Sequence, residues 1–374
     1  MKTPKRPQSG GTVSRRKFLE RVTLGGAAML ALGGRAHAAD APRKLGVALV
    51  GLGNYSRGEL GPALKLTRNC RLAGVVTGSP AKGAQWARDY GFPEKNVYGY
   101  ETMNRLADNS DIDIVYVVTP NGLHAGHSIA AARAGKHVIC EKPMANTVAD
   151  CDAIIAACKT AGVRLSIGYR LHFDPYHEVL RELVRTQEFG PFTRMHGSFA
   201  FRMGTRQWRI EKALAGGGPL MDLGVYVVQE SCMATTAAPV AVIAHEIPKK
   251  RPEFFNEVEE GIEWTLEFAD GALAKGFTSY NDSGNNFRAD AARGWFEMQS
   301  AYIYRNLRGE TNKGPLKFEP EVNQQALQMD DFAECVTTGR ASPVPGEMGR
   351  RDMRIVEAIY ASAAAGGERV EIKA

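Results

Sequence analysis

LGVALVGLGNYS, residues 45–56, joins a continuous apolar run to a glycine-rich turn, and a helical pattern follows it. A run of this kind is typical of a buried parallel strand. The glycines let the backbone approach a pyrophosphate, whose charge the free N–H groups and the dipole of the helix start would meet. We therefore predict a dinucleotide site here, with an ordinary tight turn as the alternative. Its residues are Gly51, Gly53, Asn54, Tyr55 and Ser56, and Ser56 takes the third glycine position.

The pattern that begins with this strand alternates between strand-like and helix-like segments. Strands are expected at residues 45–50, 72–76, 114–118, 137–140 and 164–167. Helices are expected between them, at residues 81–90, 102–107, 125–134 and 148–161. This order predicts a doubly wound parallel sheet with right-handed crossovers.

After about residue 170 the strand-like segments become longer and follow one another directly, as in an antiparallel sheet. They cover residues 192–201, 240–247, 262–268, 272–279 and 288–298, and helices are expected at 219–234, 323–338 and 349–364. We predict an α/β plus α+β fold. A Rossmann domain at residues 39–170 precedes a substrate-binding and oligomerisation domain at 171–374, which has an open, mainly antiparallel sheet with helices on one face. The C-terminal helix is free to pack back on the Rossmann domain.

The first 38 residues differ from the rest of the chain in charge. They hold eight Lys or Arg and one Glu, so they account for all of the net charge of +6. The remainder has no electrostatic footprint for nucleic acid. Residues 14–19 read SRRKFL, a twin-arginine signature, and a short apolar run leads to a small-x-small cleavage site, AHA, at 36–38. We expect a signal peptide at residues 1–38 that the twin-arginine (Tat) export machinery reads, and a folded mature protein in the periplasm without membrane insertion. A disordered basic tail is the alternative.

The six cysteines and eight histidines show no metal-binding or disulfide pattern. Cys151 and Cys158 are seven residues apart in a helical pattern, about 10 Å along the axis, which is too far for a bridge. No Cys-x-x-Cys or His-x-x-x-His spacing occurs. We expect buried, reduced thiols and no metal site.

The end of the second strand is where a Rossmann domain selects its cofactor. NAD enzymes place Asp or Glu there, whereas NADP needs space and positive charge for its 2′-phosphate. Residues 71–81 contain no acidic residue, Thr77 and Gly78 offer donors, and Lys82 follows. We predict NADP; the alternative is that Lys82 is a solvated helix residue.

Two further loops follow strands and are expected at the carboxyl edge of the sheet, above a nicotinamide. One contains Pro120, Asn121 and His124, and the other contains Glu141 and Lys142. A lysine there can orient a substrate hydroxyl and bias the proton equilibria of its neighbours. The alternative is that Lys142 is a surface lysine.

Glu141-Lys142-Pro143 after such a Rossmann half, with Asp222-x-x-x-Tyr226 later, resembles the glucose–fructose oxidoreductase / inositol dehydrogenase (Gfo/Idh/MocA) family of sugar oxidoreductases. Further stretches are similar to its exported glucose–fructose and aldose–aldose oxidoreductase branch. They are AGKHV at 134–138, GYR at 168–170, QWR at 207–209 and LAGGG at 214–218. The similarity runs from about residue 45 to the C-terminus.

The resemblance implies roles for individual residues. The family's catalytic lysine maps onto Lys142, its helical Asp onto Asp222, and its usual catalytic His onto Tyr226. Positions i and i+4 share one helix face, and a Tyr with an ordinary pKa of about 10 needs a nearby cation to act as a base near neutrality. Without the resemblance, Asp222 reads as a first-turn acid and Tyr226 as a core aromatic. Candidate contacts are Tyr169, His172, Asp222 and Tyr226 for substrate, and Arg170, Trp208 and Arg209 for the cofactor.

These expectations combine into one hypothesis. A periplasmic enzyme with tightly bound NADP oxidises a cyclic aldose to its lactone and passes the hydride to a second sugar carbonyl, giving an alditol by ping-pong kinetics. The alternatives are an ordinary NADP-dependent sugar dehydrogenase or reductase with exchangeable cofactor, and a non-catalytic exported sugar-binding protein. The glucose–fructose enzyme carries a long proline-rich arm before its first strand, whereas only residues 39–44 separate the cleavage site from the first strand here. We therefore expect the aldose–aldose type and a homodimer formed through the open face of the antiparallel sheet.

Overall fold

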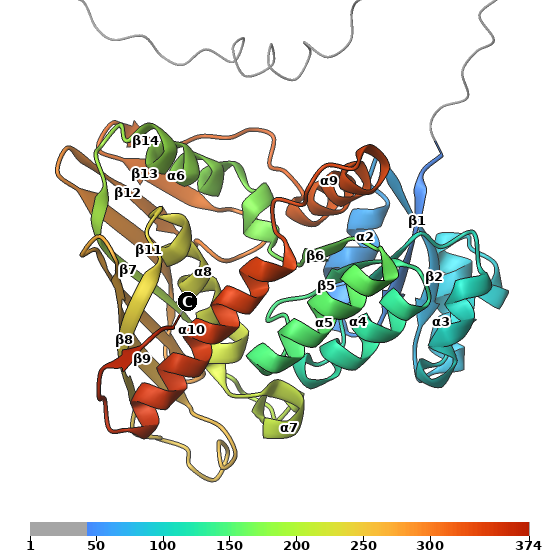
Figure 1. The fold of residues 1–374 in the computed structure, drawn as a ribbon, viewed down its shortest axis with the longest axis horizontal. Helices are drawn as coiled ribbons and strands as arrows, with labels where there is room; N and C mark the ends of the chain where they lie inside the picture. The colour runs from blue at the N-terminus through green and yellow to red at the C-terminus, as the bar shows by residue number, and fades with distance from the viewer. Residues whose placement is uncertain (1–42, 374) are drawn as a thin grey trace, which may run out of the picture. The chain divides into compact units, whose positions relative to one another are not determined.

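The computed structural model describes residues 43–373, so the signal peptide predicted at residues 1–38 lies outside the described residues. In this part of the chain the strands form two sheets (Figure 1). The smaller, Rossmann sheet has six parallel strands in the order β3-β2-β1-β4-β5-β6. In chain order they are β1 (Leu45–Val50), β2 (Cys70–Val76), β3 (Val97–Tyr98), β4 (Ile114–Val117), β5 (His137–Cys140) and β6 (Leu165–Ile167).

Apolar cores lie on both faces of the Rossmann sheet. Along β1, Val47 and Leu49 belong to one core, and Ala48 and Val50 belong to the other, because successive side chains of a strand point to opposite faces. This explains why the strand is apolar throughout. The helices of this half are α2 (Gly61–Leu64), α3 (Pro80–Tyr90), α4 (His124–Arg133) and α5 (Val148–Ala161).

The larger sheet has nine strands in the order β14-β13-β12-β11-β7-β10-β9-β8-β15 within the described residues. Adjacent strands of this sheet are antiparallel, except for β7 and β10, which pair in parallel. This arrangement confirms the predicted fold class. Its strands are β7 (Phe192–Ala200), β8 (Pro239–Glu246), β9 (Gly261–Phe268), β10 (Leu273–Ser279), β11 (Gly284–Ala291), β12 (Gly294–Gln299), β13 (Arg308–Thr311), β14 (Gly314–Pro315) and β15 (Val370–Glu371).

Three helices belong to this second half, α6 (Pro175–Thr186), α7 (Lys212–Ala215) and α8 (Val225–Met233). The α8 helix packs against β7 and β10. A π-helical turn, η7 (Leu220–Gly224), runs directly into α8. The sheet therefore supports the helix on which Tyr226 lies.

The last two helices, α9 (Gln324–Thr338) and α10 (Gly346–Ala364), follow the larger sheet in the chain and also pack on the Rossmann half. Met329 and Phe332 of α9 lie in the same core as Val47 of β1. The α10 helix packs against α5 and β6 as well as against α8 and β8. Figure 1 shows it between the larger sheet and α5.

Two elements differ in kind from their predictions. The single strand predicted at 288–298 is wrong, because the segment is the hairpin β11–β12, in which Ala291 pairs with Gly294. The apolar alternation continues through both arms and hides the two-residue turn between them. The helix predicted at 102–107 is a 3-10 helix, in which the Thr102 hydroxyl accepts from the Gly99 N–H at 3.0 Å and tightens the first turn.

Two helices of the second half, α6 and the four-residue α7, were missed, and another helix starts differently. The α6 helix was not predicted, although Asp174 caps it and Pro175 occupies its first position, a start signal that sequence can show. The helix predicted at 219–234 begins as the π-helical turn η7 before α8. Asp222 thus lies in the π turn and Tyr226 in the α-helix.

Candidate active site

The glycine-rich turn exposes backbone directly after β1. Gly51 has a φ of +99°, a conformation that favours glycine, and Ser56 Oγ donates to the Gly51 carbonyl at 2.6 Å. This hydrogen bond explains how a serine serves at the third glycine position. Gly53 is exposed, and a Cβ placed there would meet no atom within 4 Å. The exposed Asn54 follows it, so the turn has room for a dinucleotide pyrophosphate at the start of a helix.

Hydroxyl groups and a cation gather at the end of β2. The Thr77 hydroxyl accepts from the Ser79 N–H at 3.2 Å, and Ser79 caps α3 by accepting from the Lys82 N–H at 3.4 Å. Gly78 lies between these two hydroxyls and is exposed. Lys82 Nζ donates to the Leu52 carbonyl at 3.4 Å. Lys82 is exposed, and its charge lies beside the glycine-rich turn.

The loop after β4, which holds Pro120, Asn121 and His124, is fixed from two sides. Asn121 Nδ2 donates to the Ala215 carbonyl of α7 at 2.9 Å. Both ring nitrogens of the buried His124 lie within 2.9 Å of backbone carbonyls, one of them that of Pro143. Burial lowers the pKa of His124 to about 4. His124 thus ties this loop to the loop of Lys142, and its predicted cofactor contact stays a prediction.

Glu141 fixes the start of the loop that holds Lys142. Its carboxylate is buried and accepts from Tyr116 Oη at 2.6 Å and from the Lys142 N–H at 3.1 Å. Burial raises the pKa of Glu141, and the hydrogen bond from Tyr116 opposes this shift. A Cβ at Gly168 would approach the Glu141 carboxylate to 2.6 Å, so β6 can pass this close only with a glycine there.

The structure brings the three predicted catalytic residues together. Lys142 Nζ donates to the Asp222 backbone carbonyl at 2.8 Å and lies 3.6 Å from Asp222 Oδ1. The same Nζ lies 4.6 Å from the centre of the Tyr226 ring. The side chains of Lys142 and Asp222 are 12% and 16% exposed, and Tyr226 is 6% exposed. A cation, a carboxylate and a phenol thus meet in a largely desolvated place.

Asp222 is kept ionised by its neighbours. Its Oδ2 accepts from Arg209 Nε and from Tyr280 Oη, both at 3.0 Å. Burial alone would raise the pKa of Asp222, but Arg209 and Lys142 lower it below its usual range. The Arg209 guanidinium also lies 4.6 Å from the centre of the Trp208 ring. Trp208 and Arg209 therefore lie beside the carboxylate, and their predicted cofactor contacts stay predictions.

Arg170 is directed at Tyr226. The residue is 1% exposed, and its Nε donates to Tyr226 Oη at 3.3 Å. Its other donors serve the Tyr302 and Ile303 carbonyls and Gln324 Oε1. The sequence predicted a cofactor contact for Arg170. Its described hydrogen bonds all go to the protein and place a second cation beside the phenol, and the cofactor contact stays a prediction.

Tyr169 and His172, the other predicted substrate contacts, face different parts of the structure. Burial and the neighbouring Asp352 carboxylate of α10 raise the pKa of Tyr169. Arg181 Nη1 of α6 lies 2.9 Å from His172 Nδ1, and burial and this cation lower the pKa of His172. Among the interactions given for the described residues, neither side chain contacts Lys142, Asp222 or Tyr226. Their role in substrate binding stays a prediction.

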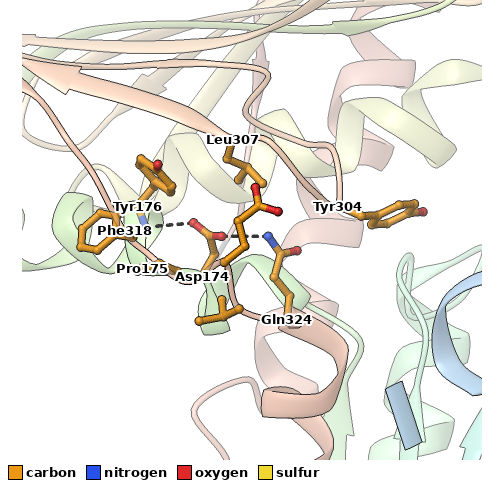
Figure 2. A pocket seen from close by; sticks show the side chains of 9 residues that line it. Asp174, Pro175, Tyr176, Tyr304, Leu307, Phe318 and Gln324 are labelled. Atoms are coloured by element: carbon orange, nitrogen blue, oxygen red, sulfur yellow. Dashed lines mark hydrogen bonds between the residues drawn. The ribbon is translucent and has the colours of Figure 1, made fainter. Parts of the chain in front are cut away.

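Three residues near the centre were not singled out from sequence, namely Tyr280, Tyr304 and Gln324. The Tyr304 ring lies 5.8 Å from the ring of Tyr55, so the glycine-rich turn meets the loop after β12 there. Tyr304 and Gln324 also line a small, open pocket (Figure 2). No local motif marks these residues, because only the tertiary fold brings them to the site.

The cysteines are buried, as predicted. All six are free and buried, and burial raises the pKa of Cys158 to about 11, which disfavours its thiolate. Among residues 43–373 no group of three His, Cys, Asp or Glu is placed to hold a metal ion. In the same residues no helix combines the length and the apolar character of a membrane span.

Two family models match the chain. Residues 45–169 match the model described as oxidoreductase family, NAD-binding Rossmann fold, and residues 177–297 match the GFO/IDH/MocA C-terminal domain. The chain belongs to the Gfo/Idh/MocA oxidoreductase family. This confirms the resemblance drawn from the sequence motifs. It also agrees with the pairing of a six-stranded Rossmann sheet with a larger, mostly antiparallel sheet.

Individual Gfo/Idh/MocA relatives cover most of the chain. The crystal structure of an aldose-aldose oxidoreductase from Caulobacter crescentus, complexed with glycerol, is 43% identical with a TM-score of 0.85, covering 88% of this chain and 100% of that one. A D-xylose 1-dehydrogenase (NADP(+)) from Haloferax volcanii is 30% identical over 316 residues, 82% of this chain and 93% of that protein. A D-xylose 1-dehydrogenase [NADP(+)] from Haloarcula marismortui is 26% identical over 326 residues, 84% of this chain and 89% of that protein.

Proposed function

We propose that the protein is an NADP-containing aldose oxidoreductase of the aldose–aldose type. It oxidises a cyclic aldose to its lactone and passes the hydride to a second sugar carbonyl, giving an alditol. The observation that carries the proposal is that Lys142, after β5, and Arg170, after β6, both lie against Tyr226, and that Lys142 also contacts Asp222. The 43% identity to an aldose-aldose oxidoreductase supports this type of chemistry.

The residues at the ends of β1 and β2 fit NADP. The exposed backbone of Gly53 would receive the pyrophosphate, and Thr77, Ser79 and Lys82 would receive the 2′-phosphate with hydroxyl groups and a positive charge. The names of the Haloferax and Haloarcula relatives include NADP(+), which supports the same choice. When bound, the nicotinamide supplies the acceptor of the hydride from the first sugar and its donor to the second.

Tyr226 is the group that moves the proton. Lys142 lies over its ring and Arg170 donates to its oxygen, so two cations lie beside the group that takes the proton. As hydride leaves C1 of the aldose, Tyr226 Oη takes the proton of the C1 hydroxyl and the C1–O double bond of the lactone forms. In the second half, Tyr226 Oη returns that proton to the carbonyl oxygen of the acceptor. Asp222, held in place by Arg209 and Tyr280, is positioned to accept a hydrogen bond from a sugar hydroxyl.

The sequence signal at residues 14–38 supports a proposal for the place of action. We propose that the protein loads NADP in the cytoplasm and is exported folded to the periplasm by the twin-arginine machinery. Because no pool of free NADP exists there, the cofactor must be re-oxidised in place by a second sugar, which requires ping-pong kinetics. Replacing Arg15 and Arg16 by Lys should leave folded, NADP-loaded protein in the cytoplasm; unchanged export would contradict the assignment.

We also propose a homodimer through the larger sheet. The α8 and α10 helices pack on the strands of this sheet, and the proposal assigns the opposite face to a second copy. Light scattering of the purified protein should give twice the mass of the mature chain. A monomer at micromolar concentration would contradict this part of the proposal.

A second candidate is a dehydrogenase with exchangeable NADP, which the names of the two xylose dehydrogenase relatives favour. Extensive dialysis followed by absorbance spectroscopy separates the two candidates. The aldose–aldose type should keep its nucleotide, reduce it on addition of an aldose alone, and re-oxidise it on addition of a second sugar. Lactone and alditol should then form one for one. A protein that dialyses empty, and works only when NADP is supplied, would be the exchangeable dehydrogenase.

A further inference from the structure

Arg170 is held in place by buried hydrogen bonds that the proposed reaction does not use. Gln324 Oε1, at the start of α9, accepts from Arg170 Nη1. Gln324 Nε2 donates to Asp174 Oδ2 at 2.8 Å, and Figure 2 shows this hydrogen bond with the two side chains facing each other. Arg170 and Gln324 are each 1% exposed and Asp174 is 3% exposed. Water therefore has little access to these hydrogen bonds.

The series of contacts between buried polar side chains continues beyond Asp174 and returns to α8, the helix of Tyr226. Asp174 Oδ1 lies 3.1 Å from His177 Nδ1, and His177 Nε2 lies 3.4 Å from Glu230 Oε1. Glu230 is in α8, one turn after Tyr226. These contacts link six buried side chains in a row from Tyr226 to Glu230, and the backbone of α8 joins the two ends. We call this set the Arg170 ring: Tyr226, Arg170, Gln324, Asp174, His177 and Glu230. It joins the end of the Rossmann sheet to α6, α8 and α9.

Gln324 separates a cation from a carboxylate within this ring. An amide can accept from Arg170 and donate to Asp174 at the same time, and it carries no charge. If a carboxylate contacted Arg170 directly, it would offset much of the positive potential that the guanidinium produces at the phenol, because such potentials are strong in a desolvated site. A neutral amide fixes the direction of the guanidinium without this loss.

We propose that Gln324 is a positioning residue that aims the Arg170 guanidinium at the Tyr226 hydroxyl and keeps its charge available to the phenolate. The inference rests on the proposed function, in which Tyr226 moves the proton. Other titratable groups also face Tyr226 or its immediate neighbours. They are Lys142 after β5, Tyr302 and Tyr304 after β12, Tyr55 in the glycine-rich turn, Glu141 near Arg170, and Asp222 one turn earlier.

The test is the pH dependence of single-turnover cofactor reduction by an aldose, measured on the whole, NADP-loaded protein. Gln324→Met removes the one side-chain acceptor that anchors Arg170 beside the Tyr302 and Ile303 carbonyls. Gln324→Glu keeps the size of the side chain but places a carboxylate on the guanidinium. Both changes weaken the stabilisation of the phenolate. The acidic limb of the rate profile should move up by about one pH unit, so the rate on that limb falls roughly tenfold while the high-pH plateau is kept. The shift should be larger for Gln324→Glu.

The matched control is Gln229→Met, because Gln229 is also a buried glutamine, 1% exposed, and its amide nitrogen lies 4.0 Å from Met348 Sδ outside the Arg170 ring. In this variant the acidic limb of the rate profile should lie at the same pH as in the wild type. Gln324 variants that fold, hold nucleotide and titrate as the wild type overturn the inference, since they would show a purely structural residue. If Gln324→Met does not fold, the isosteric Gln324→Glu decides. A Tyr226→Phe variant that still turns over normally overturns the proposed function itself, whereas a slow Phe variant beside unshifted Gln324 variants overturns only this inference.

Discussion

Replacing Tyr226 by Phe separates chemistry from packing, because it removes one oxygen atom and keeps the ring. The hydroxyl accepts one hydrogen bond, from Arg170 Nε at 3.3 Å. A hydrogen bond from a charged donor contributes about 1.5–3 kcal/mol net, and this long one belongs at the lower end. The ring contacts with Lys142, at 4.6 Å, and with Phe199, at 5.7 Å, remain. The unfolding temperature should therefore fall by only about 3–6 °C.

The expected effect on the reaction is larger than the effect on stability. A positioned general base contributes roughly 10²- to 10⁴-fold, and a hundredfold loss corresponds to about 2.7 kcal/mol of barrier. Rapid mixing of loaded enzyme with an aldose, followed by the absorbance of the reduced nicotinamide, measures this step without product release. Reduction by Tyr226→Phe should be at least a hundredfold slower while the bound nucleotide is retained.

The matched control is Tyr98→Phe in β3. It also removes a buried hydroxyl that accepts one hydrogen bond, from Asn109 Nδ2 at 2.8 Å. It should lower the unfolding temperature by a similar amount and leave the rate of reduction unchanged. If folded, loaded Tyr226→Phe reacts within threefold of the wild type, the phenol is not the base. Tyr226 is then a packing residue, and the reasoning from Lys142 and Arg170 fails.

Three further outcomes are expected. Lys142→Met removes the cation over the phenol ring and should slow the same single-turnover step by roughly a hundredfold; a normal rate would exclude a role in proton transfer. Lys82→Glu should weaken the binding of NADP about tenfold more than the binding of NAD, as measured by calorimetry on refolded protein. An equal loss of affinity for the two nucleotides would show that the 2′-phosphate binds elsewhere. Burial alone would lower the pKa of His177, yet the carboxylates of Glu230 and Asp174 raise it from 6.5 to about 9. The stability that protonated His177 adds to the fold is therefore complete below about pH 6.5 and is lost as the pH rises through 9. Unfolding temperatures measured by calorimetry should fall as the pH rises over this window. In His177→Gln this fall should be absent.

The Rossmann half was largely predictable because its signals are local. The apolar run of β1 and the glycines after it identify a strand buried on both faces and the turn that follows. The pairing of Asp222 with Tyr226 was also predictable, since a spacing of four residues puts both on one helix face. The π turn before α8 changes the local hydrogen bonding at Asp222, but both residues still reach Lys142.

The parts of the site that sequence could not show depend on long-range contacts. Tyr280 reaches Asp222 only because β10 and η7 meet in the folded protein. Arg170 follows a strand, as a cofactor ligand would, and nothing local shows that carbonyls of the loop after β12 and the Gln324 amide occupy its donors. The burial of the Arg170 side chain and the identity of its hydrogen-bond partners therefore decide its role, and both are properties of the tertiary fold.

The position of α9 in the chain decides when one core of the Rossmann sheet can be completed during translation. The core on one face of the Rossmann sheet includes Met329 and Phe332 of this helix, yet the last strand of the sheet ends at Ile167. At roughly 5–20 residues per second, the ribosome needs about 8–30 s to make the chain between Ile167 and the start of α9. During that time the nascent sheet lacks part of its apolar cover. The N-terminal half therefore cannot complete this core until α9 has been made.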